Sequence, residues 1–534
     1  MSEVLLDAGA VTRCRRRVHL EHDPTARGAV LAPPDPTADQ RIADARAHRQ
    51  AIAELLRAAV GDACWVTVPA ELPSSERVRM TAEALAQGAA FISGALLPAD
   101  TAAGRRGGAE LLVRTGRGYV PILVVRHRIS DPGEGASTTP LTELDPDHAR
   151  PDSDRKVRSH LRDQLRLVHV RELLRVAGHA EPGRARGGVI GLDADVVVWH
   201  DLDAPTFPGG ASARQEYATR FADRVAVARA AATGAEPLAV PSRIVECKHC
   251  PWGPVCELAL TGSRDVSLVV RGEDAMTLRG AGVSTVDDLA ALDPASDPPI
   301  SFTGNTFANT VALARAWLAD LTVVRRVADV SVPRADIEVD VDMESFGDHG
   351  AYLWGALLTG VDIGVQQGYH AFATWKPVPT ADEARSFAEF WSWFSDIRAR
   401  AAARGLTFRA YCYNALAENR WLLSSTRRFA GEPGIPDRAD VQSFVDSEEW
   451  VDLFRSVSES FLCTHGKGLK VIAPVAGFAW QDPEAGGEAS MRWYREAVGL
   501  NGGRPDPGQR ERLLRYNADD VRATYVLREW MSGP

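Results

Sequence analysis

The stretch IEVDVDME, from Ile337 to Glu344, alternates apolar and acidic side chains. Successive residues of a β-strand point to opposite faces of a sheet, so the alternation predicts a strand over Ile337 to Met343. Asp342 and Glu344 then share one face at the end of this strand. Two carboxylates on one face can share metal ions. The stretch therefore predicts a sheet with a candidate metal site at the end of one strand.

Further acidic residues follow along the chain. Tyr516 and Asp520 are four residues apart in a helix predicted from about Gln509 to Met531, so they share one helical face. Glu418 lies between the two groups, in a predicted strand-to-helix segment. Taken alone, each pattern is equally typical of solvated surface charge.

The order of these groups is more specific than any one of them. D-x-E at Asp342 and Glu344, then N-x3-acid ending at Glu418, then Y-x3-D at Tyr516 and Asp520 resembles the DEDDy 3′→5′ exonucleases. These enzymes have an RNase H-like fold. The segments from Gly468 to Trp480 and at Gly486-Gly487 resemble the YprB-like branch of that family in particular.

The resemblance implies two divalent metal ions, Mg²⁺ or Mn²⁺, about 4 Å apart. Their ligands would be Asp342, Glu344, Glu418 and Asp520, and Tyr516 would orient the attacking water. Glu418 departs from the family, whose second motif ends in aspartate, and its extra methylene leaves the binding of metal there open. Asp340 and Asp519 are expected to be solvated or to lie outside the ligand set.

Four cysteines form a second candidate metal site. Cys247, Cys250 and Cys256 are spaced C-x2-C-x5-C, and Cys14 stands near the N-terminus. Thiolates bind zinc or iron–sulfur clusters, and a [4Fe–4S] cluster takes four of them. A zinc site could use His249 in place of Cys14. Reduced thiols without a metal are the alternative.

This cysteine pattern resembles the iron–sulfur RecB-like nucleases, which include the AddB-type helicase-nuclease subunits. The resemblance implies a PD-(D/E)xK, restriction-endonuclease-type fold whose two ends are held together by a [4Fe–4S] cluster on Cys14, Cys247, Cys250 and Cys256. Zinc is the alternative cofactor.

The catalytic positions of that family are only partly filled. His48 and Glu110 match the first two, but Leu123 and Val125 stand where the family has Glu and Lys. An apolar pair cannot hold a divalent cation. The expectation is a degenerate N-terminal nuclease site on a domain that still binds DNA, with Arg13, Arg15, Arg16 and Arg17 as candidates for phosphate contacts or as a solvated run.

The segment from Leu278 to Leu289 matches the helix-hairpin-helix pattern L-x-G-x-G-V-x-T-x3-L. Its glycines permit a tight turn whose backbone N–H groups can face a phosphate. An ordinary helical hairpin is the alternative, because Asp287 and Asp288 would repel phosphates. Elsewhere the pattern predicts a helix over Leu161 to Val176 and buried strands over Tyr119 to Val125 and Val189 to Trp199.

The chain has 534 residues, too many for one hydrophobic core, with a net charge of −10. We expect a multidomain α/β protein: a RecB-like domain over 1–262, a helical linker over 263–330 and an RNase H-like domain over 331–534. No long apolar run or signal peptide is evident, so the expected location is the cytoplasm.

These features together predict a metal-dependent 3′→5′ DNA exonuclease acting in repair or recombination. The expected partner is DNA that is single-stranded or has a free 3′ end, with a helicase as a further partner and no membrane. Two alternatives stay open, an exoribonuclease and a non-catalytic DNA-binding adaptor.

Overall fold

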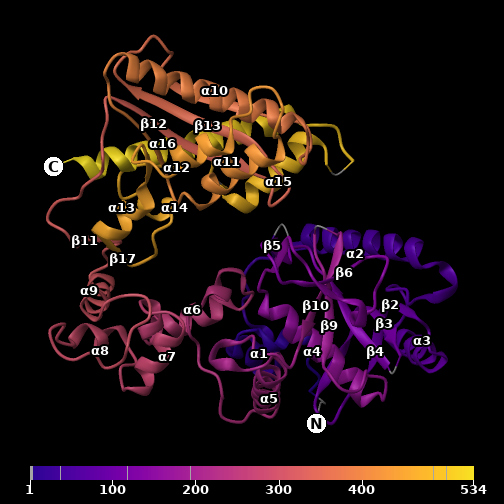
Figure 1. Cartoon of the computed structure of the whole chain (residues 1–534). Helices are drawn as coiled ribbons and strands as arrows, with labels where there is room; N and C mark the ends of the chain where they lie inside the picture. The colour runs from indigo at the N-terminus through magenta and orange to yellow at the C-terminus, as the bar shows by residue number, and fades with distance from the viewer. Residues whose placement is uncertain are drawn as a thin grey trace. The chain divides into compact units, whose positions relative to one another are not determined.

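The computed structural model describes residues 4–35, 38–116, 118–192, 194–484, 486–500 and 502–533. The chain divides into two compact units, Met1–Ser263 and Arg264–Pro534, whose positions relative to one another are not determined (Figure 1). The predicted linker segment groups with the second unit. Among the helices of the described residues, none is long and apolar enough to cross a lipid bilayer.

The first unit is built on a mixed sheet, which within the described residues has the strand order β1-β2-β3-β4-β9-β10-β6-β7. Strands β2, β3 and β4 form an antiparallel meander, and helix α4 (Leu161–Val176) then leads to β9, which runs parallel to β4. The strands are β1 (Trp65–Thr67), β2 (Phe91–Asp100), β3 (Arg105–Thr115), β4 (Gly118–Val124), β6 (Ser137–Pro140), β7 (Arg150–Pro151), β9 (Arg186–Ile190) and β10 (Val196–Asp201).

Helices cover both faces of this sheet. Side chains of α4 and α5 (Ala213–Ala232) pack with Leu123 and Val189 on one face. Helix α2 (Ala38–Val60) packs with Ile122 and Val124 on the other. Because alternate residues of β4 point to opposite cores, the whole strand is buried, as a strand between two helical layers must be. The remaining helices are α1 (Arg15–His22), α3 (Ser74–Gln87) and α6 (Gly253–Gly262).

One predicted strand of this unit is wrong. The stretch from Val189 to Trp199 is two antiparallel strands, β9 and β10, in which Val198 pairs with Val189. A turn separates them, and Ala194 in that turn has a φ of +52°. Valine and isoleucine on both sides make the stretch resemble one strand, although Gly191 and Asp195 between them are residues typical of turns.

The second unit contains a five-stranded sheet in the order β14-β13-β12-β15-β16 within the described residues. Its central strand β12 (Ile337–Ser345) runs antiparallel to β13 (Ala351–Gly360) and parallel to β15 (Phe408–Cys412). Strand β14 (Gly368–Ala373) is antiparallel to β13, and β16 (Trp450–Asp452) is parallel to β15. The predicted strand from Ile337 thus lies at the middle of the sheet.

The alternation along β12 separates two environments. The apolar residues of β12 pack against Phe387, Phe390 and Phe394 of helix α10 (Asp382–Ala403). The acidic residues face helix α16 (Pro507–Ser532), whose Arg528 pairs with Asp340 at 2.8 Å and also with Glu338. Arg528 is fully buried. The first two acids of the strand are therefore neutralised by the chain, and the last two are not.

Around this sheet lie five further helices, α11 (Leu416–Arg428), α12 (Arg438–Val445), α13 (Leu453–Ser460), α14 (Leu469–Ile472) and α15 (Gly487–Val498), among the described residues. Ahead of the sheet come α7 (Glu273–Gly280), α8 (Val286–Ala291), α9 (Phe307–Leu318) and β11 (Val323–Arg325). Strand β11 pairs with β17 (Phe461–Cys463).

The predicted hairpin is the pair α7 and α8, with Gly282 at a φ of +86° in the turn between them. The Asp288 carboxylate accepts hydrogen bonds from the backbone N–H groups of Ser284 and Thr285, at 3.1 and 2.9 Å. Asp287 pairs with Arg264. The side chain of Asp288 thus occupies amides that a phosphate would use, which favours the ordinary helical hairpin.

Candidate functional site

Three carboxylates meet at the end of β12. Oxygen atoms of Asp342, Glu344 and Asp520 lie within 4.8 Å of one another. Strand β12 supplies the first two, and α16 supplies the third. Glu344 and Asp520 are buried. The residues predicted from two distant segments are therefore brought into one group.

Glu418 lies outside this group of three carboxylates. It lies in the first turn of α11 and is buried, and its Oε2 has no hydrogen-bond partner within the described part of the chain. Its charge contributes to the raised pKa of Asp342. A buried carboxylate oxygen without a donor is costly, so this atom needs a cation or a proton.

The electrostatics of the group are those of acids crowded together. Burial, followed by the charges of Asp520, Glu344 and Glu418, raises the pKa of Asp342 well above its usual range. Burial also raises the pKa values of Glu344 and Glu418 to about 8 each. It raises the pKa of Asp520 as well. A divalent cation removes this repulsion, and oxygen donors suit Mg²⁺ and Mn²⁺. The residues fit the metal ions that the resemblance implies.

Tyr516 lies one helical turn before Asp520 on α16 and is almost fully buried. Its hydroxyl accepts a hydrogen bond from Lys470 Nζ at 3.1 Å. Burial, followed by the charges of Glu344, Asp520 and Asp342, raises the pKa of Tyr516. Trp480 Nε1 donates to Asp520 Oδ1 at 2.6 Å. The tyrosine is thus held at the edge of the carboxylate group, as its predicted role in orienting water requires.

A comparison with protein families matches residues 426–532 to the family RNase_H_2, described as RNase_H superfamily. The matched range includes Lys470, Trp480, Tyr516 and Asp520. This part of the second unit is therefore similar to the RNase H superfamily. No curated protein and no solved structure matches the chain.

The second unit holds the carboxylate of Asp342 through residues that the sequence did not single out. Asn517 Nδ2 donates to Asp342 Oδ2 at 2.7 Å, and Tyr369 donates to Asn517 Oδ1 at 2.6 Å. Tyr352 lies 3.5 Å from Glu344 Oε2. The only sequence signal for Asn517 was its place next to Tyr516 in the helix. In the structure its side chain points toward the sheet, where it contacts Asp342.

Of the two expectations for Asp340 and Asp519, solvation is wrong because both are buried, and a place outside the ligand set agrees with the structure. Asp340 is fully buried in its ion pair with Arg528. Asp519 is 3% exposed and accepts hydrogen bonds from the backbone and side chain of Gln481, at 2.9 and 2.8 Å. Asp519 thereby fastens the segment that carries Trp480 to α16. Both residues lie outside the carboxylate group.

In the first unit, the four cysteines lie in one neighbourhood. Cys14 precedes α1, and its backbone N–H donates to Glu246 at 2.6 Å, within the turn that carries Cys247. Burial, with contributions from other thiols of the set, raises the pKa values of Cys14 and Cys250, and that of Cys256 to about 11. No three of these sulfur atoms lie within 4.8 Å of one another.

The predicted nuclease positions of this unit do not form a carboxylate group. Leu123 and Val125 are buried in a hydrophobic core. Glu110 accepts a hydrogen bond from Arg166 at 2.8 Å. His48 is on α2, where burial lowers its pKa.

The arginine run at the start of α1 is engaged within the unit. Arg15 pairs with Asp223 at 2.9 Å, and Arg17 pairs with Glu21 and Glu246. Arg13 also pairs with Glu21, and Arg16 donates to the Ala239 carbonyl. These guanidinium groups have acidic or carbonyl partners, which weakens their case as phosphate ligands.

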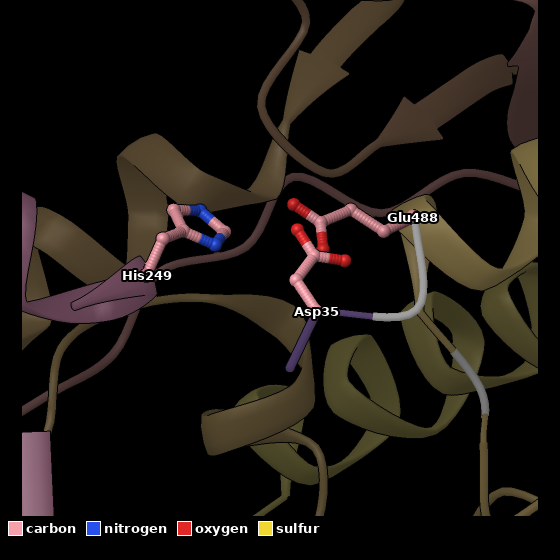
Figure 2. A group of neighbouring side chains, drawn as sticks. All are labelled: Asp35, His249 and Glu488. Carbon is pink, nitrogen blue, oxygen red and sulfur yellow. The ribbon is translucent and has the colours of Figure 1, made fainter. Parts of the chain in front are cut away.

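Figure 2 draws Asp35, His249 and Glu488. Asp35 and His249 belong to the first unit and Glu488 to the second, and the units are not placed relative to one another. Neither unit holds the three residues by itself.

Proposed function

We propose that the chain is a metal-dependent 3′→5′ DNA exonuclease of the DEDDy type. The observation that carries the proposal is the group of Asp342, Glu344 and Asp520, with Tyr516 one helical turn before Asp520 on the same helix. Bound divalent ions would supply the activated water and stabilise the leaving oxygen. The RNase H superfamily match indicates a nuclease-type activity and agrees with this assignment.

The chain's own residues would divide the remaining work. Asp342, Glu344, Glu418 and Asp520 bind the cations, and Asn517 fixes the orientation of Asp342. Tyr516 positions the attacking water, and this role needs no change in its ionisation. The substrate is DNA that is single-stranded or has a free 3′ end, and repair or recombination with a helicase is the expected setting.

The decisive experiment is digestion of 5′-labelled single-stranded DNA with Mn²⁺, comparing the wild-type chain with Asp342→Ala. A ladder that shortens from the 3′ end and vanishes in the variant supports the proposal. The same digestion on an RNA oligonucleotide of matched sequence tests the exoribonuclease alternative. If neither polymer is cut, the protein is a non-catalytic adaptor.

For the first unit we propose a DNA-binding RecB-like domain that does not cut, with its cysteines holding a [4Fe–4S] cluster. Cys14, Cys247, Cys250 and Cys256 supply the four thiolates that such a cluster takes, and their mutual influence on one another's pKa values places them close together.

Metal analysis and visible absorbance of anaerobically purified protein test this cofactor. Iron with broad visible absorbance, lost in Cys250→Ser, supports the cluster. Zinc without colour would instead assign the site to a tetrahedral ion. DNA binding by the wild-type chain and by the Cys250→Ser variant tests whether the first unit presents the substrate.

A further inference from the structure

Lys470 contacts Tyr516 and Trp480, two residues beside the carboxylate group. It lies on the short helix α14, and its side chain is exposed. Its Nζ donates to the Tyr516 hydroxyl at 3.1 Å and lies 4.6 Å from the centre of the Tyr516 ring. It also lies 5.6 Å from the centre of the Trp480 ring. The ammonium is therefore held at the site while one side stays open to solvent.

The charge of Lys470 acts on three of the four carboxylates. It opposes the rise in the pKa values of Asp342, Glu344 and Asp520. No other basic residue is among the principal influences on these three groups. The geometry agrees with this, because the Lys470 ammonium donates to Tyr516 and lies over Trp480, whose Nε1 donates to Asp520 Oδ1.

Charge balance gives this ammonium a role. With two divalent cations bound, the four carboxylates of the site are neutralised. A phosphodiester adds a further negative charge, and more negative charge develops on its oxygens as the bond to water forms. The chain must supply the balancing positive charge itself, and Lys470 is placed to do so.

The residue type also matters. Lysine accounts for only five of the 61 basic residues, so arginine is the chain's usual cation. A guanidinium fork at position 470 would match the carboxylates bidentately and compete with metal ions for them. A compact ammonium with rotatable donors can bind Tyr516 and still donate to a phosphate oxygen.

We propose that Lys470 is a further catalytic residue, which donates to a non-bridging oxygen of the terminal phosphate and fixes the Tyr516 hydroxyl. This inference rests on the proposed exonuclease function. In the reaction, the water oxygen bonds to phosphorus as the bond from phosphorus to the neighbouring 3′ oxygen breaks. A proton from the water passes to that 3′ oxygen, giving a nucleoside 5′-monophosphate and a strand one nucleotide shorter.

The first test compares the wild-type chain with Lys470→Gln, Lys470→Arg and Lys467→Gln in the DNA digestion with Mn²⁺. Lys467 is the matched control, a lysine three residues earlier with no hydrogen bond from its side chain to the site within the described residues. Loss of one donor to the developing charge lowers kcat about 100-fold in Lys470→Gln. Lys470→Arg keeps part of the activity, and Lys467→Gln keeps all of it.

Calorimetric titration with Mn²⁺ separates this role from a structural one. Lys470→Gln removes a positive charge beside the carboxylates, so its Mn²⁺ affinity stays the same or rises while kcat falls. Loss of Mn²⁺ binding in Lys470→Gln would assign a structural role and overturn the inference. A kcat within about threefold of the wild-type value would also overturn it.

Binding of thymidine 5′-monophosphate in the presence of Mn²⁺ tests the phosphate contact without cleavage. We expect about 10-fold weaker binding to Lys470→Gln, the usual effect of losing a charge-assisted hydrogen bond. Should the wild-type chain fail to cut nucleic acid, the exonuclease proposal fails, and this titration still decides the role of Lys470. Equal nucleotide affinity in the two proteins overturns the inference.

Discussion

Asn517 on helix α16 donates from Nδ2 to Asp342 Oδ2 at 2.7 Å, and this bond joins the last helix of the sheet domain to its first strand. The oxygen of the same amide, Asn517 Oδ1, accepts a hydrogen bond from the Tyr369 hydroxyl. Asn517 thus sets which oxygen of Asp342 remains open to a cation, although it is not an acid and binds no metal itself in the proposed site.

Replacing Asn517 with Ala should weaken Mn²⁺ binding about 10- to 100-fold, as is usual when the partner of a metal ligand is lost. Calorimetric titration measures the effect. Asn309→Ala, on α9 of the same unit, is the matched control and should bind Mn²⁺ normally. Normal affinity in Asn517→Ala would show that Asp342 is oriented by other contacts.

Gly355 on β13 leaves the space that Asn517 occupies. A Cβ at position 355 would lie 1.7 Å from Asn517 Oδ1. Gly355→Ala should therefore displace the amide and cost about 1–3 kcal/mol of unfolding free energy, with loss of exonuclease activity. Gly487→Ala, whose Cβ meets nothing within 4 Å, serves as the control in denaturant unfolding and in DNA digestion.

The pH dependence of the stability of the metal-free protein follows from its crowded acidic residues. Burial raises the pKa values of Glu344 and Glu418 from an ordinary 4.5 to about 8. Because the folded state favours the protonated acids, stability should fall as the pH rises from about 4.5 to about 8.

Cation binding needs the deprotonated acids, so Mn²⁺ affinity should rise over the same range. Melting curves with and without Mn²⁺, at about pH 6 and about pH 9, measure both effects, and the Mn²⁺-dependent rise in Tm should be larger at the higher pH. Glu418→Gln should make the Tm of the metal-free protein less dependent on pH. A shift in Tm that is the same at both pH values would contradict the placement of these acids in one group.

Arg528 is a fully buried cation between two acids of β12, Glu338 and Asp340. Arg528→Ala leaves buried charges without a partner, and we expect a loss of about 3–5 kcal/mol in unfolding free energy. Denaturant unfolding measures it. Arg455→Ala, which breaks the exposed pair with Glu459, should leave the unfolding midpoint unchanged.

Much of the C-terminal site could be predicted from sequence because its residues obey simple periodicities. The period of two along β12 put Asp342 and Glu344 on one face, and the helical spacing put Tyr516 beside Asp520. Their meeting in space was implied by the family resemblance, since spacing within a segment says nothing of distant segments. The environment of Asp340 could not be foreseen, because its partner Arg528 lies 188 residues further on.

Local sequence also failed where side chains compete for backbone groups. The Gly-rich turn near Gly282 fits a phosphate-binding hairpin, but Asp288 binds the amides of Ser284 and Thr285 itself. In the run from Val189 to Trp199, high β-propensity concealed a turn, because propensity reports a preference for strands and not where one strand ends.

The placement of Asp520 and Tyr516 on α16, after every strand of the sheet, has a consequence for biosynthesis. On the ribosome, β12 emerges long before α16, and until α16 docks the emerging chain has Asp342 and Glu344 without their partners. In the proposed exonuclease, the carboxylate group is therefore incomplete in a nascent chain. The order of elements completes the site only once α16 has been synthesised and has docked.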